Sequence, residues 1–228
     1  MTTLTVADYA DTGQWRLIVN IHPSGMTAFL ENTLHDDVEP QQLFSTRWEP
    51  DRENLLHNIE NAVYDNPRML DDFSARIILF DRRTMFIPTA LVEENDGIEE
   101  DYFTDLYHAA KQDVMVETDR DLTAAYSLAP GLKSFLNRTF PGARVSSNLM
   151  TQVSRLRKDN SGKGLTMSVT HRDQEREADF ILLDGEDLIS ASTHSVGCPE
   201  DIIYHLYNII DAYGYNPDDV MVPEPYRI

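Results

Sequence analysis

The most constraining feature of this sequence is that its two ends carry the same order of predicted elements. Residues 15–80 read as two strands joined by a turn, a third strand, a helix and a last strand, and residues 164–222 read the same way. Short runs rich in β-branched, aromatic and aliphatic residues, bounded by turn-forming residues, mark the strands. A repeated βββαβ unit predicts a chain built from two related halves.

Local patterns place the elements of the first copy. A turn is expected at His22–Gly25, where Pro and Gly occur together. A helix is expected after Pro50-Asp51, because Leu56, Ile59 and Val63 recur at helical spacing and form one apolar stripe. The expected strands are Trp15–Ile21, Met26–Glu31, Leu43–Trp48 and Arg76–Phe80.

The second copy has clearer signals. A hairpin turn is expected at Asp184-Gly185, and a helix from Pro199 to Gly214, because proline and acids favour a helix N-terminus. One helix shields only one face of a sheet. Apolar side chains of this half are therefore expected to pack on bridging residues Leu149–Leu156 or on a partner chain, with candidates at Phe180, Leu182, Leu188 and Val220–Val222. The expected strands are Leu165–His171, Ala178–Leu183, Leu188–Ser195 and Val220–Val222.

A bridging region separates the copies. Helices are expected at Glu99–Lys111, after Pro130-Gly131 and after Ser147, with short extended segments between them. The stretch Arg157–Gly164 has the charged, Gly- and Ser-containing composition of a linker. The predicted domains are therefore residues 1–157, the first half with bridging helices, and residues 164–228, an abbreviated second half.

Charge and composition exclude several classes of protein. The 228 residues include 19 Lys and Arg against 39 Asp and Glu, a formal net charge of −20. Such a charge opposes binding to nucleic acids, which depends on Lys and Arg at phosphates, and to anionic membrane surfaces. The single cysteine, Cys198, excludes an internal disulfide and a cysteine metal cluster. Because no signal-peptide pattern and no long apolar run occurs, we expect a soluble, cytoplasmic protein without membrane insertion.

Several stretches carry a resemblance when they are taken together: Arg76–Phe80 followed by Phe86–Pro88, Ala125–Leu128, Phe140-Pro141 leading into Ser146–Asn148, and Glu200–Tyr204. They resemble an uncharacterised bacterial family of unknown function whose members have an actin-like ATPase (ribonuclease-H-like) fold. The resemblance covers about Trp15 to Val222 and implies an α/β fold with two pseudo-duplicate βββαβ halves, the second abbreviated. More distantly, the order of elements resembles actin-like scaffold proteins of type IV pili and type II secretion. The family has no established activity, so the resemblance assigns no site residue.

The resemblance also implies where a nucleotide would be held. Actin-like ATPases contact phosphate through a hairpin loop in each half, where an acid orients metal-bound water and glycines let backbone N–H groups approach the anion. Here Asn20 stands at the position of the first acid, and Pro23 removes a backbone donor. The equivalent second turn, Asp173–Glu177, is charged and lacks glycine. The sequence therefore predicts that both phosphate loops are lost.

Metal-dependent chemistry has little support in the sequence. Ribonuclease-H-like nucleases need several carboxylates around divalent metal, yet Asn20 replaces the central one, and Asp179 is interpreted as an edge or outward residue. His171 and His194 are candidates for neighbouring positions on adjacent strands, with ordinary strand histidines as the alternative. Asp201 and His205 share a helix face and are interpreted as a solvated ion pair. We predict no catalytic residue, no metal site and no cofactor; cofactor-binding residues remain unassigned.

Other motifs have simple structural interpretations. Gly162-Lys-Gly164 lacks the glycine spacing of a P-loop and reads as a flexible basic linker. The acids within Glu93–Asp101 do not have the spacing of a Ca²⁺ loop and are interpreted as a solvated loop. Cys198 is interpreted as a structural thiol near a helix start.

Three hypotheses for function remain. The first is a degenerate actin-like protein that binds another protein, as a scaffold or binding module, without catalysis. The second is an ATPase or phosphotransferase with atypical phosphate loops, and the third is a subunit whose second half is completed by another chain. Glycine and acid content at Asn20–Gly25 and Asp173–Glu177 favours the first, and therefore a protein that is not an enzyme.

Overall fold

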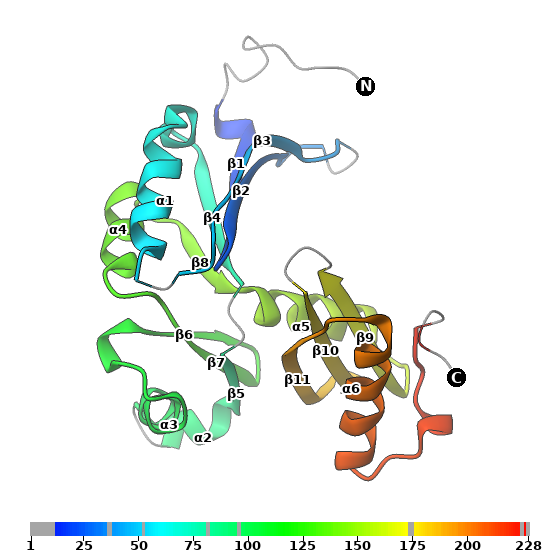
Figure 1. Cartoon of the computed structure of the whole chain (residues 1–228). Helices are drawn as coiled ribbons and strands as arrows, with labels where there is room; N and C mark the ends of the chain where they lie inside the picture. Colours follow the sequence, from blue (N-terminus) through cyan, green and yellow to red (C-terminus); the bar gives the residue numbers. More distant parts are fainter. Residues whose placement is uncertain are drawn as a thin grey trace. The chain divides into compact units, whose positions relative to one another are not determined.

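The structure, a computed structural model, describes residues 12–35, 38–51, 53–80, 83–94, 97–172, 176–223 and 226 (Figure 1). The chain divides into two compact units. Unit 1 comprises Met1–Asp81, Glu100–Val116 and Tyr126–Ser147, and unit 2 comprises Arg82–Glu99, Glu117–Ala125 and Asn148–Ile228.

Unit 1 contains a five-stranded sheet in the order β3-β2-β1-β4-β8. The strands β1, β2 and β3 pair antiparallel, whereas β4 runs parallel to β1, and β8 runs parallel to β4. Every second residue of β1 is apolar and points to the same face of the sheet. On that face these residues pack against buried residues of α1 and α4. The bounds are β1 Trp15–His22, β2 Gly25–Asn32, β3 Gln41–Arg47, α1 Leu55–Tyr64, β4 Ser74–Leu79, α4 Leu132–Thr139 and β8 Arg144–Ser147.

The first helix begins later than its sequence pattern predicts. The carboxylate of Asp51 accepts hydrogen bonds from the backbone N–H of Glu53 at 2.9 Å and from the side-chain amide of Asn54 at 2.6 Å. These bonds form a turn, so α1 begins at Leu55. They also lower the pKa of Asp51, with the Asn54 amide as the main cause.

Unit 2 contains a three-stranded antiparallel sheet in the order β11-β10-β9. A single parallel bridge joins Thr166 on β9 to Met221, at the place where the repeat predicts a last strand. This order matches β3-β2-β1-β4 of unit 1, which confirms the duplicated βββαβ plan and the shorter second half. The bounds are α5 Asn148–Asp159, β9 Leu165–Arg172, β10 Glu177–Asp184, β11 Asp187–Ser195 and α6 Pro199–Ala212.

Both faces of this second sheet are covered from within the chain. Phe180 and Leu182 pack with Val220 and Val222 among the buried residues of α6. Ile181 and its neighbour Leu183 point the opposite way and pack against α5, together with Leu122 and Ala124. The expected packing on residues Leu149–Leu156 is therefore intramolecular. Of the expected candidates only Leu188 lies on the α5 side, because alternate strand residues point to opposite faces.

A third sheet has the order β5-β7-β6. Its central strand is β7, whose six residues are all buried. The short strand β5 and helix α2, which the sequence analysis did not predict, precede the predicted helix α3. The bounds are β5 Thr84–Pro88, α2 Thr89–Glu94, α3 Ile98–Tyr107, β6 Val114–Asp119 and β7 Leu122–Ser127. Short 3₁₀ helices lie at Thr12–Gln14, Pro67–Leu70, Lys111–Asp113 and Pro217–Asp219.

The chain passes between the two compact units several times, and its last change falls between Ser147 and Asn148, so α5 belongs to unit 2. The domain boundary expected between Arg157 and Gly164 stays a prediction. The expected flexible linker is in part anchored. Arg157 is 5% exposed and donates to the backbone oxygen of Glu186 at 2.6 Å, and the buried amide of Asn160 donates to Gly185 O at 2.7 Å.

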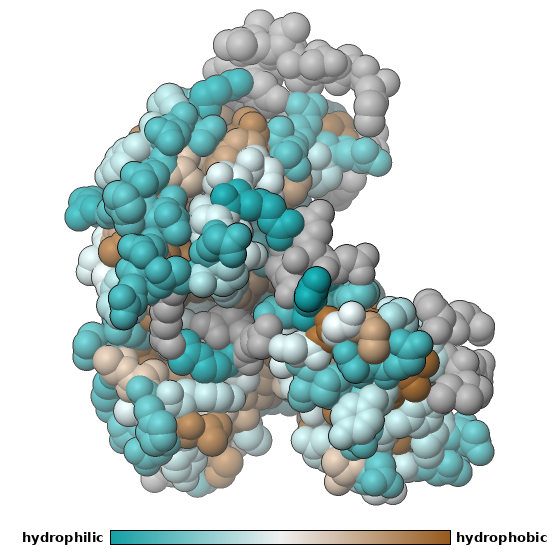
Figure 2. Space-filling view, in the orientation of Figure 1, coloured by the Kyte–Doolittle hydropathy of each residue, from teal (hydrophilic) through white to brown (hydrophobic). Residues whose placement is uncertain are grey.

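Among the described residues, no helix is long and apolar enough to cross a membrane. Figure 2 shows hydrophilic residues over much of the visible face, with hydrophobic residues interspersed.

Candidate functional site

The first candidate site is the β1–β2 hairpin, where the resemblance places a phosphate loop. The turn residues Pro23 and Ser24 are held by Trp48. Its indole N–H donates to Pro23 O at 2.9 Å, and its backbone N–H donates to Ser24 O at 3.0 Å. Beside the turn, the ring of His22 stacks on Phe80 with 3.8 Å between centroids. Aromatic side chains of the chain itself therefore lie beside this turn, while Pro23 is exposed.

A small cavity lies next to the same hairpin. Its volume is about 40 Å³, far below the roughly 300–1,000 Å³ of a typical small-molecule site. The hydroxyl of Ser127 lines it, is buried, and has no hydrogen-bond partner among the described residues. The other lining residues are Ile21, His22, Pro23, Leu55, Leu79, Phe80, Leu128, Ala129 and Leu132. This lining contains no Lys or Arg that would neutralise a phosphate.

The glycine of the hairpin has a packing role. A Cβ at Gly25 would lie 2.6 Å from the backbone oxygen of Thr46, so β2 and β3 approach too closely there for any side chain. Asn20 lies on the sheet face opposite the α1 and α4 side, in register with Thr27 and Ile78. Its Oδ1 is buried and without a partner among the described residues.

The second candidate site is the β9–β10 hairpin. Of the predicted turn Asp173–Glu177, the residues 173–175 lie outside the described residues. At its base, Arg172 donates to the carboxylate of Glu177 at 2.9 Å and to the carboxylate of Asp179. Burial acts to lower the pKa of Arg172, but the charges and hydrogen bonds of the two carboxylates outweigh it and raise that pKa. The guanidinium is thus already neutralised within the unit.

The prediction that Asp179 is an edge or outward residue is wrong. Asp179 lies on the central strand β10, is 1% exposed and faces α5. Besides Arg172, three side chains donate to its carboxylate: Asn148 at 2.9 Å, Gln152 at 2.6 Å and Thr193 at 2.6 Å. A buried carboxylate requires such partners, because an unpaired buried charge is very costly.

Helix α5 supplies two of those donors from its first two turns. Asn148 is its first residue, and Gln152 lies one turn further and also accepts from Thr170 at 2.8 Å. The N-terminal end of a helix carries partial positive charge, which favours a nearby carboxylate. The network therefore fixes α5 to the sheet through Asp179. A lone acid within the apolar run Ala178–Leu183 was the sequence signal for a buried, paired charge.

The histidines form a different pair from the predicted one. His171 and His194 both lie in register with Ala178, so the central strand separates them. Instead His194 stacks on His205 of α6, with 4.3 Å between ring centroids. Burial and the charge of His205 lower the pKa of His194. Among the described residues, no group of three or more His, Cys, Asp or Glu is placed to hold a metal ion.

Asp201 caps helix α6 and makes no ion pair with His205 in the described chain. Its carboxylate accepts from the backbone N–H of Gly197 at 2.7 Å and of Cys198 at 3.2 Å, and these bonds lower its pKa. Cys198 precedes the helix, as predicted, and is exposed. The largest single effect on the thiol pKa of Cys198 is a hydrogen bond from the backbone N–H of Asp201, which lowers it. The hydrogen bond with Glu200, burial and the charge of Asp201 act in the opposite direction and together raise the pKa. An exposed thiol with a raised pKa carries little thiolate, so it does not stand out as a nucleophile.

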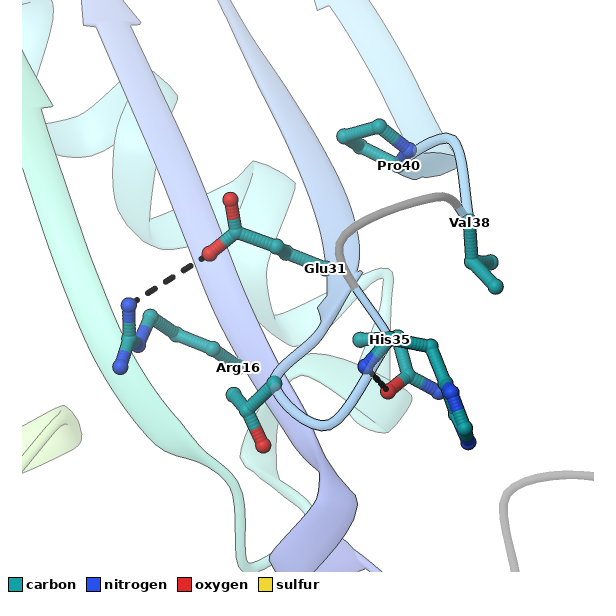
Figure 3. A pocket seen from close by; sticks show the side chains of 7 residues that line it. Arg16, Glu31, His35, Val38 and Pro40 are labelled. Carbon is teal, nitrogen blue, oxygen red and sulfur yellow. Dashed lines mark hydrogen bonds and ion pairs between the residues drawn. The ribbon is translucent and has the colours of Figure 1, made fainter.

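A larger hollow of about 380 Å³ lies at the end of the β1–β2 ladder (Figure 3). Arg16 and Glu31, on neighbouring strands, point toward one another across 3.5 Å, and both side chains are about half exposed. The side-chain Oδ1 of Asn32 accepts from the backbone N–H of His35 at 3.0 Å. The two charges are already paired, so the hollow presents no unneutralised charge of either residue.

Comparisons with known proteins agree with this fold. The model of a family described as "Protein of unknown function (DUF3822)" matches residues 7–223. No curated protein sequence gives a match. A Bacteroides thetaiotaomicron protein described as having an actin-like ATPase fold and unknown function aligns with a TM-score of 0.77 at 17% identity. The alignment covers 97% of this chain and 95% of that one. This likeness confirms the predicted actin-like ATPase fold.

Two other solved structures are more distant. The cytoplasmic domain of EpsL, an inner-membrane component of the Vibrio cholerae type II secretion system, aligns with a TM-score of 0.45 at 10% identity, covering 92% of this chain and 82% of that one. The PilM–PilN type IV pilus biogenesis complex gives a TM-score of 0.45 at 11% identity, covering 86% of this chain and 72% of that one.

Proposed function

This chain belongs to the DUF3822 family of proteins of unknown function and has an actin-like ATPase fold, and we propose that it binds another protein and hydrolyses no nucleotide. One observation carries the proposal. In unit 1, Trp48 hydrogen-bonds the turn that would hold phosphate and His22 stacks on Phe80 beside it, and the adjacent cavity of about 40 Å³ is far smaller than the roughly 300–1,000 Å³ of a small-molecule site.

The hairpin of unit 2 supports the same proposal. Phosphate recognition relies on available cations and backbone donors. At the base of this hairpin, Arg172 is neutralised by two carboxylates, Glu177 and Asp179. A phosphate arriving there would meet a group of net negative charge, which repels it. The net charge of −20 likewise supports a protein partner over a nucleic acid.

Two buried side-chain oxygens without hydrogen-bond partners among the described residues favour the alternative, a nucleotide-binding protein. Asn20 Oδ1 and Ser146 Oγ lie on one face of the first sheet, on either side of Ile78, and both are buried without partners among the described residues. Buried polar atoms in proteins nearly always have partners, so a water or a bound ligand would satisfy them. Neither atom is cationic, and two neutral polar atoms do not neutralise a triphosphate.

The two functions are separated by assaying phosphate release from ATP–Mg²⁺ with purified protein against a control without protein. We expect no release above that control. Turnover that disappears in Asn20→Ala but persists in Ser45→Ala would overturn the proposal. Ser45 is the matched control because it lies in the same row of the sheet and is exposed.

The protein-binding half of the proposal has its own measurement. Tagged protein is used to capture partners from native cells, and bound proteins are quantified by mass spectrometry against a tag-only control. We expect one protein to be retained at a level comparable to that of the tagged chain. Capture of nothing beyond the tag-only background would contradict the proposal.

A further inference from the structure

The two outer strands of the second sheet differ in what lies beside them. Along β9, the backbone N–H of Met167 donates to Met221 O, and the backbone N–H of Met221 donates to Leu165 O, both at 2.9 Å. Along β11, the described part of the chain makes backbone pairs only with β10. Figure 1 shows β11 as an outer strand of this sheet. The outer row of backbone groups of β11 is therefore left without a strand neighbour.

Over Ser190–Ser195, the free edge lacks several of the features that normally protect such a strand. Folded proteins shield edges with lysine, proline, very short strands or bulges. The one bulge here lies between the pairs Leu182–Ser190 and Leu183–Leu188, which leaves Ser190–Ser195 in regular register. That stretch contains no proline, lysine, arginine or carboxylate. Six residues are enough for an ordinary short strand to pair alongside.

Small side chains on both faces leave space for an incoming strand. Ser190 and Ser192 lie on the α6 side, and Ala191 and Thr193 lie on the α5 side. All four are half-buried, because α5 and α6 already cover the two faces. By contrast β3, an outer strand of the first sheet, carries the longer, exposed residues Gln42 and Arg47.

We propose that β11 binds an extended segment of a partner protein as an added antiparallel or parallel strand along Ser190–Ser195. This inference rests on the proposed protein-binding function and names its surface. Backbone hydrogen bonds supply the affinity in such pairing, and alternate side chains of the segment supply the selectivity. The rigid support from α5, fixed through Asp179 and Thr193, holds the edge in a strand conformation before the segment arrives.

Charge identifies the kind of segment. Two copies of this chain would each bring a net charge of −20, which opposes their pairing edge to edge. Exposed carboxylates of Asp184 and Asp187 lie at the turn where β11 begins. The fitting partner therefore has an extended segment with alternating small apolar residues and with lysine or arginine at its ends.

The test uses the full chain and a short peptide of alternating valine and threonine with lysine at each end. Amide hydrogen exchange locates the bound peptide, and fluorescence anisotropy measures its affinity. A peptide with the same charges and a central proline is the control, because proline removes a backbone donor. We expect the first peptide to slow exchange of amides in β11, and the proline peptide to bind at least about tenfold more weakly, a difference of about 1.4 kcal/mol.

Protein variants assign the effect to this edge. Ser192→Lys and Ser190→Lys add a lysine to β11, and Ser45→Lys makes the same charge change on β3. We expect both β11 variants to lose binding by about tenfold or more while the β3 variant binds like the wild type. Equal binding by the two peptides, or protection outside β11, would overturn this inference. If the edge proposal fails in this way but a partner protein is still captured, the proposed function stands. Turnover of ATP would instead refute the proposed function and leave the peptide-binding result at β11 unaffected.

Discussion

Removing the carboxylate of Asp179 is expected to destabilise the protein strongly. Asp179→Ala removes one of the two carboxylates that pair with the guanidinium of Arg172, whose side chain is 11% exposed. It also removes the acceptor for Asn148, Gln152 and Thr193. Breaking a buried ion pair by deleting one partner costs about 3–5 kcal/mol. For a chain of this size, each kcal/mol shifts Tm by about 2–4 °C, so Tm should fall by roughly 6–20 °C.

Thermal unfolding followed by calorimetry measures this effect. The matched control is Asp187→Ala, which removes an exposed aspartate from the same sheet and should change stability by less than about 0.5 kcal/mol. Asp179→Asn keeps the size and one acceptor oxygen but removes the charge, so its Tm should lie between those of the wild type and Asp179→Ala. If Asp179→Ala and Asp187→Ala unfold at the same temperature, the network does not stabilise the fold and the reasoning is refuted.

The other predictions concern a histidine pair and a close backbone approach. Because the pKa of His194 is lowered in the folded chain, the unfolded state binds more protons, and stability should fall as pH drops through about 6.5, the ordinary value. His194→Gln should show a smaller loss of Tm between about pH 7.5 and 5.5; an identical loss would count against the pair's role. Gly25→Ala should cost about 1–3 kcal/mol, because its Cβ would clash with Thr46 O. Gly164→Ala, whose Cβ meets nothing within 4 Å, should unfold at the wild-type temperature within about 2 °C.

Local sequence patterns were sufficient for most of the fold. The strands of both copies except the last could be predicted because β-branched and aliphatic residues cluster between turn residues such as Pro23 and Gly185. The strand expected at Val220–Val222 is a single bridge at Met221. The final helix followed from Pro199 and the acids behind it. The two ends of the chain show the same order of strands and helix, and this repeat indicated the two-half architecture.

The side-chain networks could not be predicted in the same way. Both faces of β10 are covered, so the strand reads as a nearly continuous apolar run in which alternation does not reveal the face of Asp179. Its pairing with Arg172 depends on the register across a hairpin, and its contacts with α5 join residues about 30 positions apart. Composition likewise suggested a linker at Arg157–Gly164, whereas the bonds of Arg157 and Asn160 to the β10–β11 turn are non-local.

The most direct test of the account is whether the purified chain binds ATP–Mg²⁺, measured as the change in Tm on titration to millimolar nucleotide. The small cavity beside the first hairpin and the neutralised Arg172 predict no change in Tm beyond that caused by the same ionic strength of salt. Nucleotide at about 100 times its Kd would add about 2.7 kcal/mol of stability, or roughly 5–11 °C in Tm. A saturable rise of that size, lost in Asn20→Ala and kept in Ser45→Ala, would contradict the central claim.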